Sequence, residues 1–427
     1  MKYFCPLFLV CCLFLLSPIH AAEPWPEYLG PQGLGHAVQL ENKDIPLEWS
    51  ESKNVLWKSS VPGKGWSSPV VGDNEIWFTS ASEDGKKRFL LCYDLLTGKK
   101  TQDILLYNVE KVEKCHRTNS YASPTPVIDS ERVYVHFGTI GTAAIDRKTG
   151  KKIWDRTDLR WEPIQGFGAS PTLWKNLLIL TCDGGDVQFL IAMDKDTGKT
   201  VWKTNRSVPF TDEKPVFRKG YCSSTVLNYE GVDYLVSSSS KAAYAYDPAT
   251  GKELWRFIFP KFSETSTMRP RLWKNKIIVN SGFPKATLYA LDITKRGEID
   301  SKDFYWQNGQ NFHPVPVPVL VDGYLYGTDG KGIVFCVSAE NGKTVWRKRV
   351  GGEFWTSTIY QNGRIYVFDT ESKTYVIAAD PKECRILATN TLADGCMATP
   401  AFLGDSVIIR TKTALYRIGA PQFAGKK

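Results

Sequence analysis

Pairs of short apolar segments separated by tight polar turns recur along almost the whole chain. Each unit begins with a small or polar residue, continues into an apolar run, turns through residues such as Gly, Asp or Asn, and returns as a second apolar run. Short apolar runs bounded by turn residues predict β-strands joined as hairpins. Eight such units can be found, at residues 66–80, 122–138, 169–182, 223–238, 268–282, 316–330, 356–370 and 398–412.

A second motif follows these hairpins and combines a strand, a turn and a tryptophan. Its pattern is a small residue, any residue, Asp, two residues, Thr-Gly-Lys, two or three residues and Trp, and it is clearest at 144–154, 192–202 and 245–255. The Asp and Thr side chains can cap turn amides, and Gly can adopt the left-handed conformation that reverses the chain. Repeats of about 40–50 residues with four strands each are typical of β-propellers. Weaker copies lie at 92–102, 290–300, 336–346 and 378–387. The centres of all seven copies follow one another at intervals of 42 to 53 residues.

The two ends of the chain complete the last repeat. The eighth hairpin is followed by a third strand at 414–419 but by no fourth, while residues 54–62 form a strand ahead of the first hairpin. Pairing these two segments closes the ring and removes the open sheet edges of a linear array. We therefore expect an all-β protein, an eight-bladed β-propeller of four-stranded antiparallel blades, as one domain over residues 54–419. Residues 23–53 are then an N-terminal extension, and residues 420–427 a C-terminal tail.

The tryptophans of the second motif have a structural interpretation. Each lies at the end of an outer strand, where it can wedge against the next blade, and the small residue of the motif leaves room for the ring. A stripe of ligand-stacking rings is the alternative, but recurrence at the same point of every unit favours a role in the core. The expected docking residues are Trp57, Trp154, Trp202, Trp255, Trp306 and Trp346.

Residues 1–22 have the features of a secretory signal peptide. A positive residue precedes an apolar run, and Ala21 and Ala22 are the small residues before the expected cleavage point. The apolar run is short for a membrane span, and Cys11 and Cys12 lack the preceding small residue of a lipoprotein acceptor. We expect export to the periplasm or the cell exterior, without a membrane-spanning segment.

Composition adds few functional constraints. The net charge of +9 is spread over 427 residues without a Lys/Arg block, which argues against a nucleic-acid partner. Seven cysteines follow the signal peptide, an odd number without a CxxC pair, so disulfides are possible but their pattern is open. We expect a monomer.

The motif AxDxxTGKxxW, repeated at this period, resembles the tryptophan-docking repeat of pyrroloquinoline-quinone (PQQ) proteins. That superfamily contains quinone-dependent alcohol dehydrogenases and non-catalytic members such as the BamB-type barrel-assembly lipoprotein. The segments 25–35, 46–71 and 386–419 also resemble a group of exported PQQ-like propellers that is typical of planctomycete-type bacteria. The resemblance covers nearly all of the chain after the signal peptide, and it implies the propeller fold and export.

The resemblance to the dehydrogenases does not extend to their cofactor site. Those enzymes hold the quinone between a Trp floor and a vicinal disulfide, bind Ca²⁺ through carboxylates and amides, and use an Asp as base. After the signal peptide the sequence has no adjacent cysteines, and it has no CxxCH, GxSxG, HExxH or Walker motif. We expect no cofactor, no metal site and no catalytic residues, with PQQ and calcium as the alternative.

Polar and aromatic residues just before the innermost strands form the candidate ligand site, because these strand starts surround one mouth of a propeller's channel. Arg269 is the most unusual of them, since other blades have Ser, Ala or Pro there, and a buried unpaired cation is costly. It is either a loop charge that faces water or pairs with Glu264, or part of a basic, aromatic-edged funnel for an anionic or carbohydrate ligand. The candidates are Lys64, Trp66, His116, Arg117, Asn119, Arg218 with Lys219, Arg269, His313 and Trp355.

Three functions fit these observations. The first, which we expect, is a non-catalytic binding or scaffold protein for a protein or glycan ligand at the channel mouth. The second is a PQQ-dependent quinoprotein oxidoreductase. The third is a carbohydrate-active enzyme that uses carboxylates such as Asp73, Glu162 and Asp186, which a separation of about 5–9 Å across a cleft would favour.

Overall fold

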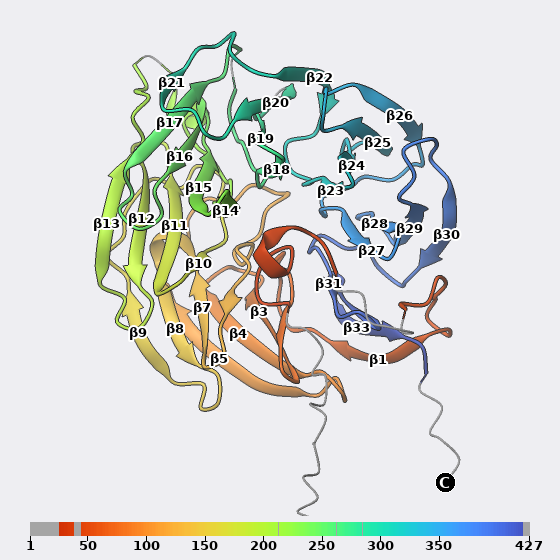
Figure 1. Ribbon diagram of the computed structural model, residues 1–427. Helices are drawn as coiled ribbons and strands as arrows, with labels where there is room; N and C mark the ends of the chain where they lie inside the picture. The colour runs from red at the N-terminus through yellow and green to blue at the C-terminus, as the bar shows by residue number, and fades with distance from the viewer. Residues whose placement is uncertain (1–24, 38–43, 212, 262, 284, 422–427) are drawn as a thin grey trace, which may run out of the picture.

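The chain forms eight β-sheets arranged in a ring around a central channel (Figure 1). The computed structural model describes residues 25–37, 44–211, 213–261, 263–283 and 285–421. The expected eight-bladed propeller is confirmed, and regular helix among the described residues is limited to three single 3₁₀ turns: η1 (Pro31–Gly33), η2 (Gly138–Ile140) and η3 (Pro215–Phe217). The predicted signal peptide, residues 1–22, lies outside the described residues.

In the first four blades, the chain runs outward from the channel through consecutive antiparallel strands. Blade 1 contains β2 (Val70–Gly72), β3 (Glu75–Ala81), β4 (Lys87–Asp94) and β5 (Lys100–Asn108), and blade 2 contains β6 (Val127–Ile128), β7 (Arg132–His136), β8 (Thr142–Asp146) and β9 (Lys152–Arg156). Blade 3 contains β10 (Thr172–Trp174), β11 (Leu177–Asp183), β12 (Gln188–Asp194) and β13 (Thr200–Asn205), and blade 4 contains β14 (Thr225–Tyr229), β15 (Val232–Ser238), β16 (Ala242–Tyr246) and β17 (Glu253–Ile258).

The remaining blades repeat this order until the ring closes. Blade 5 contains β18 (Arg271–Trp273), β19 (Lys276–Asn280), β20 (Ala286–Asp292) and β22 (Trp306–Phe312), and blade 6 contains β23 (Val319–Val321), β24 (Tyr324–Thr328), β25 (Ile333–Ser338) and β26 (Thr344–Arg349). Blade 7 contains β27 (Ile359–Gln361), β28 (Arg364–Phe368), β29 (Lys373–Ala378) and β30 (Ile386–Thr391), and blade 8 contains β31 (Ala401–Phe402), β32 (Ser406–Arg410), β33 (Ala414–Gly419) and β1 (Val55–Ser60).

Blade 8 joins the two ends of the described chain, as predicted. In Figure 1 the red β1 lies beside the blue β33. The two strands are antiparallel, with Lys58 opposite Tyr416 and Ser60 opposite Ala414. The backbone N–H of Gly419 donates to the carbonyl of Asn54 at 3.0 Å, so these two positions are adjacent.

The recurring spacing of the turn motif within the chain has a local physical cause. In blade 2, Asp146 accepts hydrogen bonds from both the backbone N–H and the hydroxyl of Thr149, each at 2.7 Å. Gly150 follows with φ of +69°, where a side chain is strained. The same pair of bonds joins Asp94 to Thr97 and Asp194 to Thr197. Asp, Thr and Gly therefore fix the hairpin between the third and fourth strands of a blade.

Each of the six expected docking tryptophans donates its indole N–H to a backbone carbonyl in the turn of the next blade. For four of these rings, a Cβ on the turn glycine would clash: one added at Gly98 would lie 2.6 Å from the Trp57 ring, and Trp154, Trp202 and Trp306 pack in the same way against Gly198, Gly251 and Gly342. Blade 1 has Gln102 at this position, and its amide donates in the same way to the carbonyl of Arg147 at 2.8 Å. The tryptophan bonds, all 2.8–3.0 Å long, are Trp57 to Leu95, Trp154 to Lys195, Trp202 to Pro248, Trp255 to Ile293, Trp306 to Ala339 and Trp346 to Asp380.

The sequence insertion before Trp306 adds a strand to the neighbouring blade. Residues Gly297–Ile299 form β21, which pairs in parallel with β17 and makes blade 4 five-stranded. Blade 5 then resumes at β22, which takes the outer position against β20. The insertion thus covers the outer edge of blade 4, which would otherwise be open to solvent.

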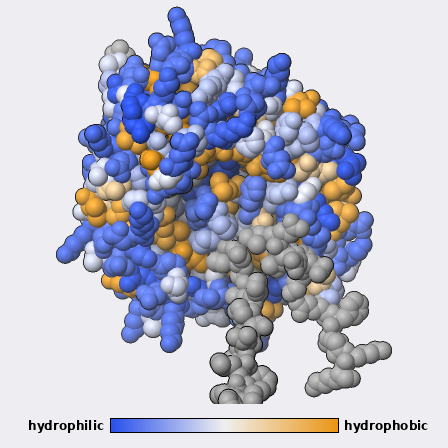
Figure 2. Space-filling model, viewed as in Figure 1, coloured by the Kyte–Doolittle hydropathy of each residue, from blue (hydrophilic) through white to orange (hydrophobic). Residues whose placement is uncertain are grey.

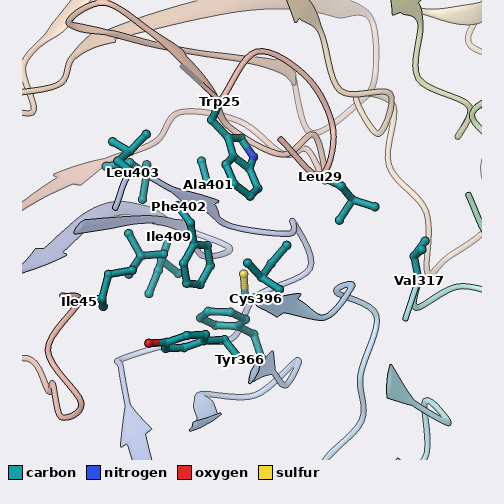
Figure 3. Close-up of a cluster of buried hydrophobic side chains, with 14 of the residues drawn as sticks. Trp25, Leu29, Ile45, Val317, Tyr366, Cys396, Ala401, Phe402, Leu403 and Ile409 are labelled. Carbon is teal, nitrogen blue, oxygen red and sulfur yellow. The ribbon is translucent and has the colours of Figure 1, made fainter. Parts of the chain in front are cut away.

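The first part of the N-terminal extension lies across the channel. The backbone of Trp25 pairs with Val71 of blade 1, and the backbones of Gly35 and Ala37 bond to Tyr360 of blade 7. Trp25 and Leu29 are buried in a large hydrophobic cluster shared with blades 7 and 8. Figure 3 shows the Trp25 indole pointing toward Phe402, whose ring centre lies 6.2 Å away. We call residues 25–37 the plug.

The second part of the extension packs on the outside of the ring before entering β1. Trp49 is buried, and its backbone N–H donates to the side chain of Asn390 in β30 at 2.8 Å. The Asn390 amide in turn donates to the carbonyl of Leu47. Tyr416 of β33 donates its hydroxyl hydrogen to Glu51 at 2.8 Å. These contacts bind the extension to blades 7 and 8.

Hydrophilic residues dominate the face in Figure 2, and hydrophobic residues are scattered over it in small groups. No helix in the described part of the chain is long and apolar enough to cross a membrane. The seven cysteines in the described part of the chain are all unpaired, and five of them are buried.

His136 at the end of β7 makes folding stability depend on pH. Burial lowers the pKa of its imidazole from an ordinary value of about 6.5 to about 3, so the imidazole is neutral in the folded chain. Its Nδ1 contacts the Thr142 hydroxyl at 2.8 Å. The unfolded chain takes up a proton below pH 6.5 and the folded chain does not, so stability falls as pH falls. We expect about 2 kcal/mol of the unfolding free energy to be lost through His136 between pH 7 and pH 5.

Urea unfolding of the native chain and of His136→Gln at both pH values measures this loss. The variant keeps a polar side chain but has no group that titrates in this range. Other titrating groups contribute equally to both proteins, so the difference between their pH dependences isolates His136. Equal pH dependences would contradict the prediction.

Candidate functional site

A cavity of about 430 Å³ lies at the channel mouth, the end at which the innermost strands start. All eight blades contribute to its lining, which includes Ser68 before β2, Ser170 before β10 and Thr399 before β31. The plug supplies Tyr28, whose hydroxyl contacts Ser357 at 2.7 Å. Ligand pockets have volumes of about 300–1,000 Å³, so the cavity is large enough for a small molecule or the end of a chain.

One position, two residues before the innermost strand, recurs in every blade and forms what we call the pre-strand ring. In several blades its hydroxyl accepts a backbone N–H from the preceding blade. The bonds run from Ser68 to Thr125 (3.0 Å), from Thr125 to Ser170 (2.9 Å) and from Ser170 to Ser223 (2.8 Å), and then from Val317 to Ser357 and from Ser357 to Thr399 (3.0 Å each). The hydroxyls therefore hold adjacent blades together at the mouth.

Arg269 occupies the ring position of blade 5 and interrupts this pattern. Its guanidinium pairs with Glu27 of the plug at 2.7 Å and donates to the carbonyl of Tyr28 at 2.6 Å. The side chain is 1% exposed and does not line the cavity. The prediction of a loop charge facing water or paired with Glu264 is wrong, because the plug brings a carboxylate from a distant part of the chain. Arg269 fastens the plug.

Five of the predicted ligand-site residues do line the cavity: Trp66, His116, Asn119, His313 and Trp355. Lys219, which adjoins Arg218 in sequence, lines it as well. The remaining candidates lie outside this lining. Lys64 is exposed, with its ammonium 5.5 Å from the centre of the Trp66 ring, Arg117 is exposed, and Arg218 donates to the carbonyl of Glu213 at 2.8 Å.

His313 and Trp355 form one aromatic wall of the cavity. Their ring centres are 5.5 Å apart in an edge-to-face arrangement. The Nδ1 of His313 accepts the backbone N–H of Val315 at 3.2 Å, and burial lowers the pKa of the imidazole, which keeps it neutral at pH 7. The Trp355 indole donates to Glu353 at 2.8 Å, which fixes the orientation of the ring. Both side chains are thus held in place before any ligand arrives.

Lys219 and Glu264 are the charged pair of the lining. Their ammonium and carboxylate are 3.0 Å apart, and the side chains are 3% and 10% exposed. Among the described residues, no other Asp, Glu, Lys or Arg lines the cavity. Because the two charges neutralise each other, the cavity wall has no net charge.

The carboxylates considered for carbohydrate hydrolysis do not lie across a cleft. Asp73 is in the turn at the far end of β2, where it pairs with Arg147 at 3.1 Å. Asp186 accepts the backbone N–H of Glu162 at 2.6 Å, in an interaction that orders a loop. None of the three lines the cavity.

Several lining residues were not predicted from sequence. They are Tyr28 on the plug, Tyr221 and Phe283 on loops, and Glu264 as an inward-facing group. The Ser and Thr residues of the pre-strand ring carried a signal, namely their recurrence before each inner strand. The plug and loop residues occur once each and have no repeat that would reveal their positions.

A family model described as outer membrane protein assembly factor BamB matches residues 43–160, 183–311 and 304–413. The outer membrane protein assembly factor BamB of Moranella endobia (strain PCIT) is 23% identical over 308 residues, which cover 68% of this chain and 72% of that protein. The quinohemoprotein alcohol dehydrogenase of Comamonas testosteroni is 29% identical over 147 residues, 31% of this chain. That match spans about a fifth, 19%, of the dehydrogenase.

Solved structures show the same fold. The crystal structure of the Comamonas testosteroni dehydrogenase has a TM-score of 0.68 at 14% identity and covers 96% of this chain and 83% of its own. The crystal structure of BamB from Moraxella catarrhalis has a TM-score of 0.58 at 12% identity and covers 86% of this chain and 99% of its own. With the family match extending over most of the sequence, the chain belongs to the BamB family of PQQ-like repeat β-propellers.

Proposed function

We propose that this protein is an exported, non-catalytic binding protein whose ligand occupies the cavity at the channel mouth. The observation that carries the proposal is the construction of the cavity: all eight blades supply its wall, and aromatic and polar side chains are held in place around it. Concave sites of this size, with apolar walls and a few fixed polar groups, are typical ligand sites. The ligand is a protein segment or a glycan.

The donor groups of the cavity do not fit PQQ with calcium. Ca²⁺ takes about 6–8 oxygen ligands, several of them carboxylates. In the described lining the single carboxylate is Glu264, and Lys219 already occupies it. Across the described residues no group of three or more His, Cys, Asp or Glu is placed to hold a metal ion. The chemistry of the lining therefore favours binding over quinone-dependent oxidation.

Reconstitution with PQQ and Ca²⁺ tests the choice between binding and oxidation. The purified chain is expected to show no bound-quinone absorbance and no dye-linked alcohol oxidation after incubation with both. A saturable quinone spectrum with oxidation of an alcohol would overturn the non-catalytic proposal. The quinohemoprotein relative, whose name states its activity, is a suitable positive control.

Export and a monomeric state are part of the same proposal. The intact mass of the mature protein, recovered from a bacterial periplasmic fraction, should correspond to cleavage near Ala21 or Ala22. Light scattering should give the mass of a single chain. A chain that keeps its first 22 residues and stays in the cytoplasm would contradict the export proposal.

A further inference from the structure

We propose that the ligand of the cavity is an uncharged carbohydrate chain, of which one end or a short stretch enters the channel mouth. This inference rests on the proposed function, since it names the class of ligand that the binding site takes. Three properties of the wall carry it: its charge, the hydroxyl groups that it presents, and its aromatic rings.

The paired charges of the cavity wall favour an uncharged ligand over an ionic one. An anionic ligand is bound by Arg or Lys groups that have no competing partner. Here Lys219 is paired with Glu264. Arg269, which the sequence suggested for this task, is paired with Glu27 of the plug, and neither of these two residues lines the cavity. A cationic ligand would need a free carboxylate, and Glu264 is already paired. An uncharged ligand leaves this pair intact.

Three hydroxyl groups of the pre-strand ring are available to a ligand. Thr125, Ser170 and Ser223 each line the cavity and accept a backbone N–H from the preceding blade. Their own hydroxyl hydrogens donate to no side chain or backbone group among the described residues. A hydroxyl that already accepts one bond can still donate. Successive blades therefore present a row of donors along one wall, which a row of sugar hydroxyls can accept.

Aromatic rings complete the site for a sugar. Trp66 and Trp355 lie on the wall of the cavity, and His313 lines it beside Trp355. Aromatic side chains offer an apolar face to the C–H face of a sugar ring while their polar atoms bond elsewhere. The indole nitrogen of Trp66 is buried and has no hydrogen-bond partner in the described part of the chain. A fully apolar ligand would leave these polar groups unsatisfied.

Titration calorimetry with neutral oligosaccharides tests the inference. The probes are maltohexaose, cellohexaose, xylohexaose and chitohexaose, with a hexamer of galacturonic acid as the anionic probe and an uncharged extended peptide as the protein-like probe. We expect saturable binding of at least one neutral oligosaccharide, and Trp355→Ala should weaken it about tenfold or more, as for a buried aromatic contact. Added salt should change this affinity little, because salt screens charge–charge attraction.

The matched control is Trp273→Ala. Trp273 ends the innermost strand of blade 5 and donates to Glu340, and it does not line the cavity. It should leave oligosaccharide binding unchanged. Trp66→Phe serves as a second cavity variant that keeps a ring but removes the indole N–H, so the test does not depend on the folding of Trp355→Ala alone.

The outcomes distinguish a wrong ligand class from a wrong binding function. Trp355-dependent binding of the acidic or the peptide probe, without binding of neutral sugars, would overturn the ligand class and leave the binding function in place. No Trp355-dependent binding of any probe would overturn both. Equal weakening by Trp355→Ala and Trp273→Ala would mean that binding does not occur in the cavity, and it would also overturn the inference.

Discussion

A chain that begins at Gly63 is expected to lose cooperative folding, because it lacks the strand that closes the ring. Its blade 8 would keep three strands, and the edge of β33 would be open along residues 414–419. The docking of Trp57 against the turn of blade 1 would also be lost. Single domains are stable by about 5–15 kcal/mol, and the loss of the outer strand that closes the ring, together with the half-buried Trp57, removes a large part of that stability. Soluble yield, gel filtration and the thermal circular-dichroism transition measure the effect.

Grafting the closing strand onto the other end is the control for this deletion. Because Asn54 and Gly419 are hydrogen-bonded neighbours, residues 54–62 can follow Gly419 through a short Gly/Ser turn and pair with β33 as a hairpin. This permuted chain should recover a cooperative transition, at a lower temperature than the native chain because it lacks the plug. A deletion variant that melts within a few degrees of the native chain would show that the ring does not need β1.

The parts of the fold that the sequence predicts are those that repeat. Asp146, Thr149 and Gly150 determine a turn within a few residues of themselves, and Trp154 then reaches the equivalent turn of the next blade. Such contacts follow from local spacing and from stacking each repeat on its neighbour. This is why the blades, their number and the closing pair could be predicted. The parallel strand β21 could not, because its insertion occurs once.

The candidate site was predictable in its position but not in its charges. Placing the strand starts at one mouth correctly brought Trp66, His313 and Trp355 together. The direction of a loop cation depends on whether a carboxylate is nearby, and that partner can come from anywhere in the chain. Arg218 and Lys219 are neighbours in sequence, yet Lys219 turns inward to Glu264 while Arg218 bonds within its own loop. Sequence alone does not distinguish them.

Arg269 is a further residue whose partner cannot be identified from the sequence, and its substitution is expected to destabilise the fold strongly. Glu264 is five residues away, whereas its actual partner, Glu27, is 242 residues away on the plug. The other ring positions hold Ser, Thr or Val, so Arg269→Ser gives blade 5 the residue that is most frequent at this position. The variant should nevertheless lose about 3–5 kcal/mol of unfolding free energy, because it leaves the carboxylate of Glu27 partly buried and without its cation. The carbonyl of Tyr28 also loses its donor.

A double-mutant cycle with Glu27→Gln separates the ion pair from the rest of the contact. Glu27→Gln alone leaves Arg269 buried and uncompensated, so it should also destabilise the chain. The combined variant removes both charges, and its cost should be smaller than the sum of the two single costs by more than about 1 kcal/mol. Urea unfolding of the four proteins gives these free energies. Additive costs, or a loss below about 1 kcal/mol for Arg269→Ser, would mean that Arg269 does not fasten the plug and that the buried apolar contacts of Trp25 and Leu29 hold it by themselves.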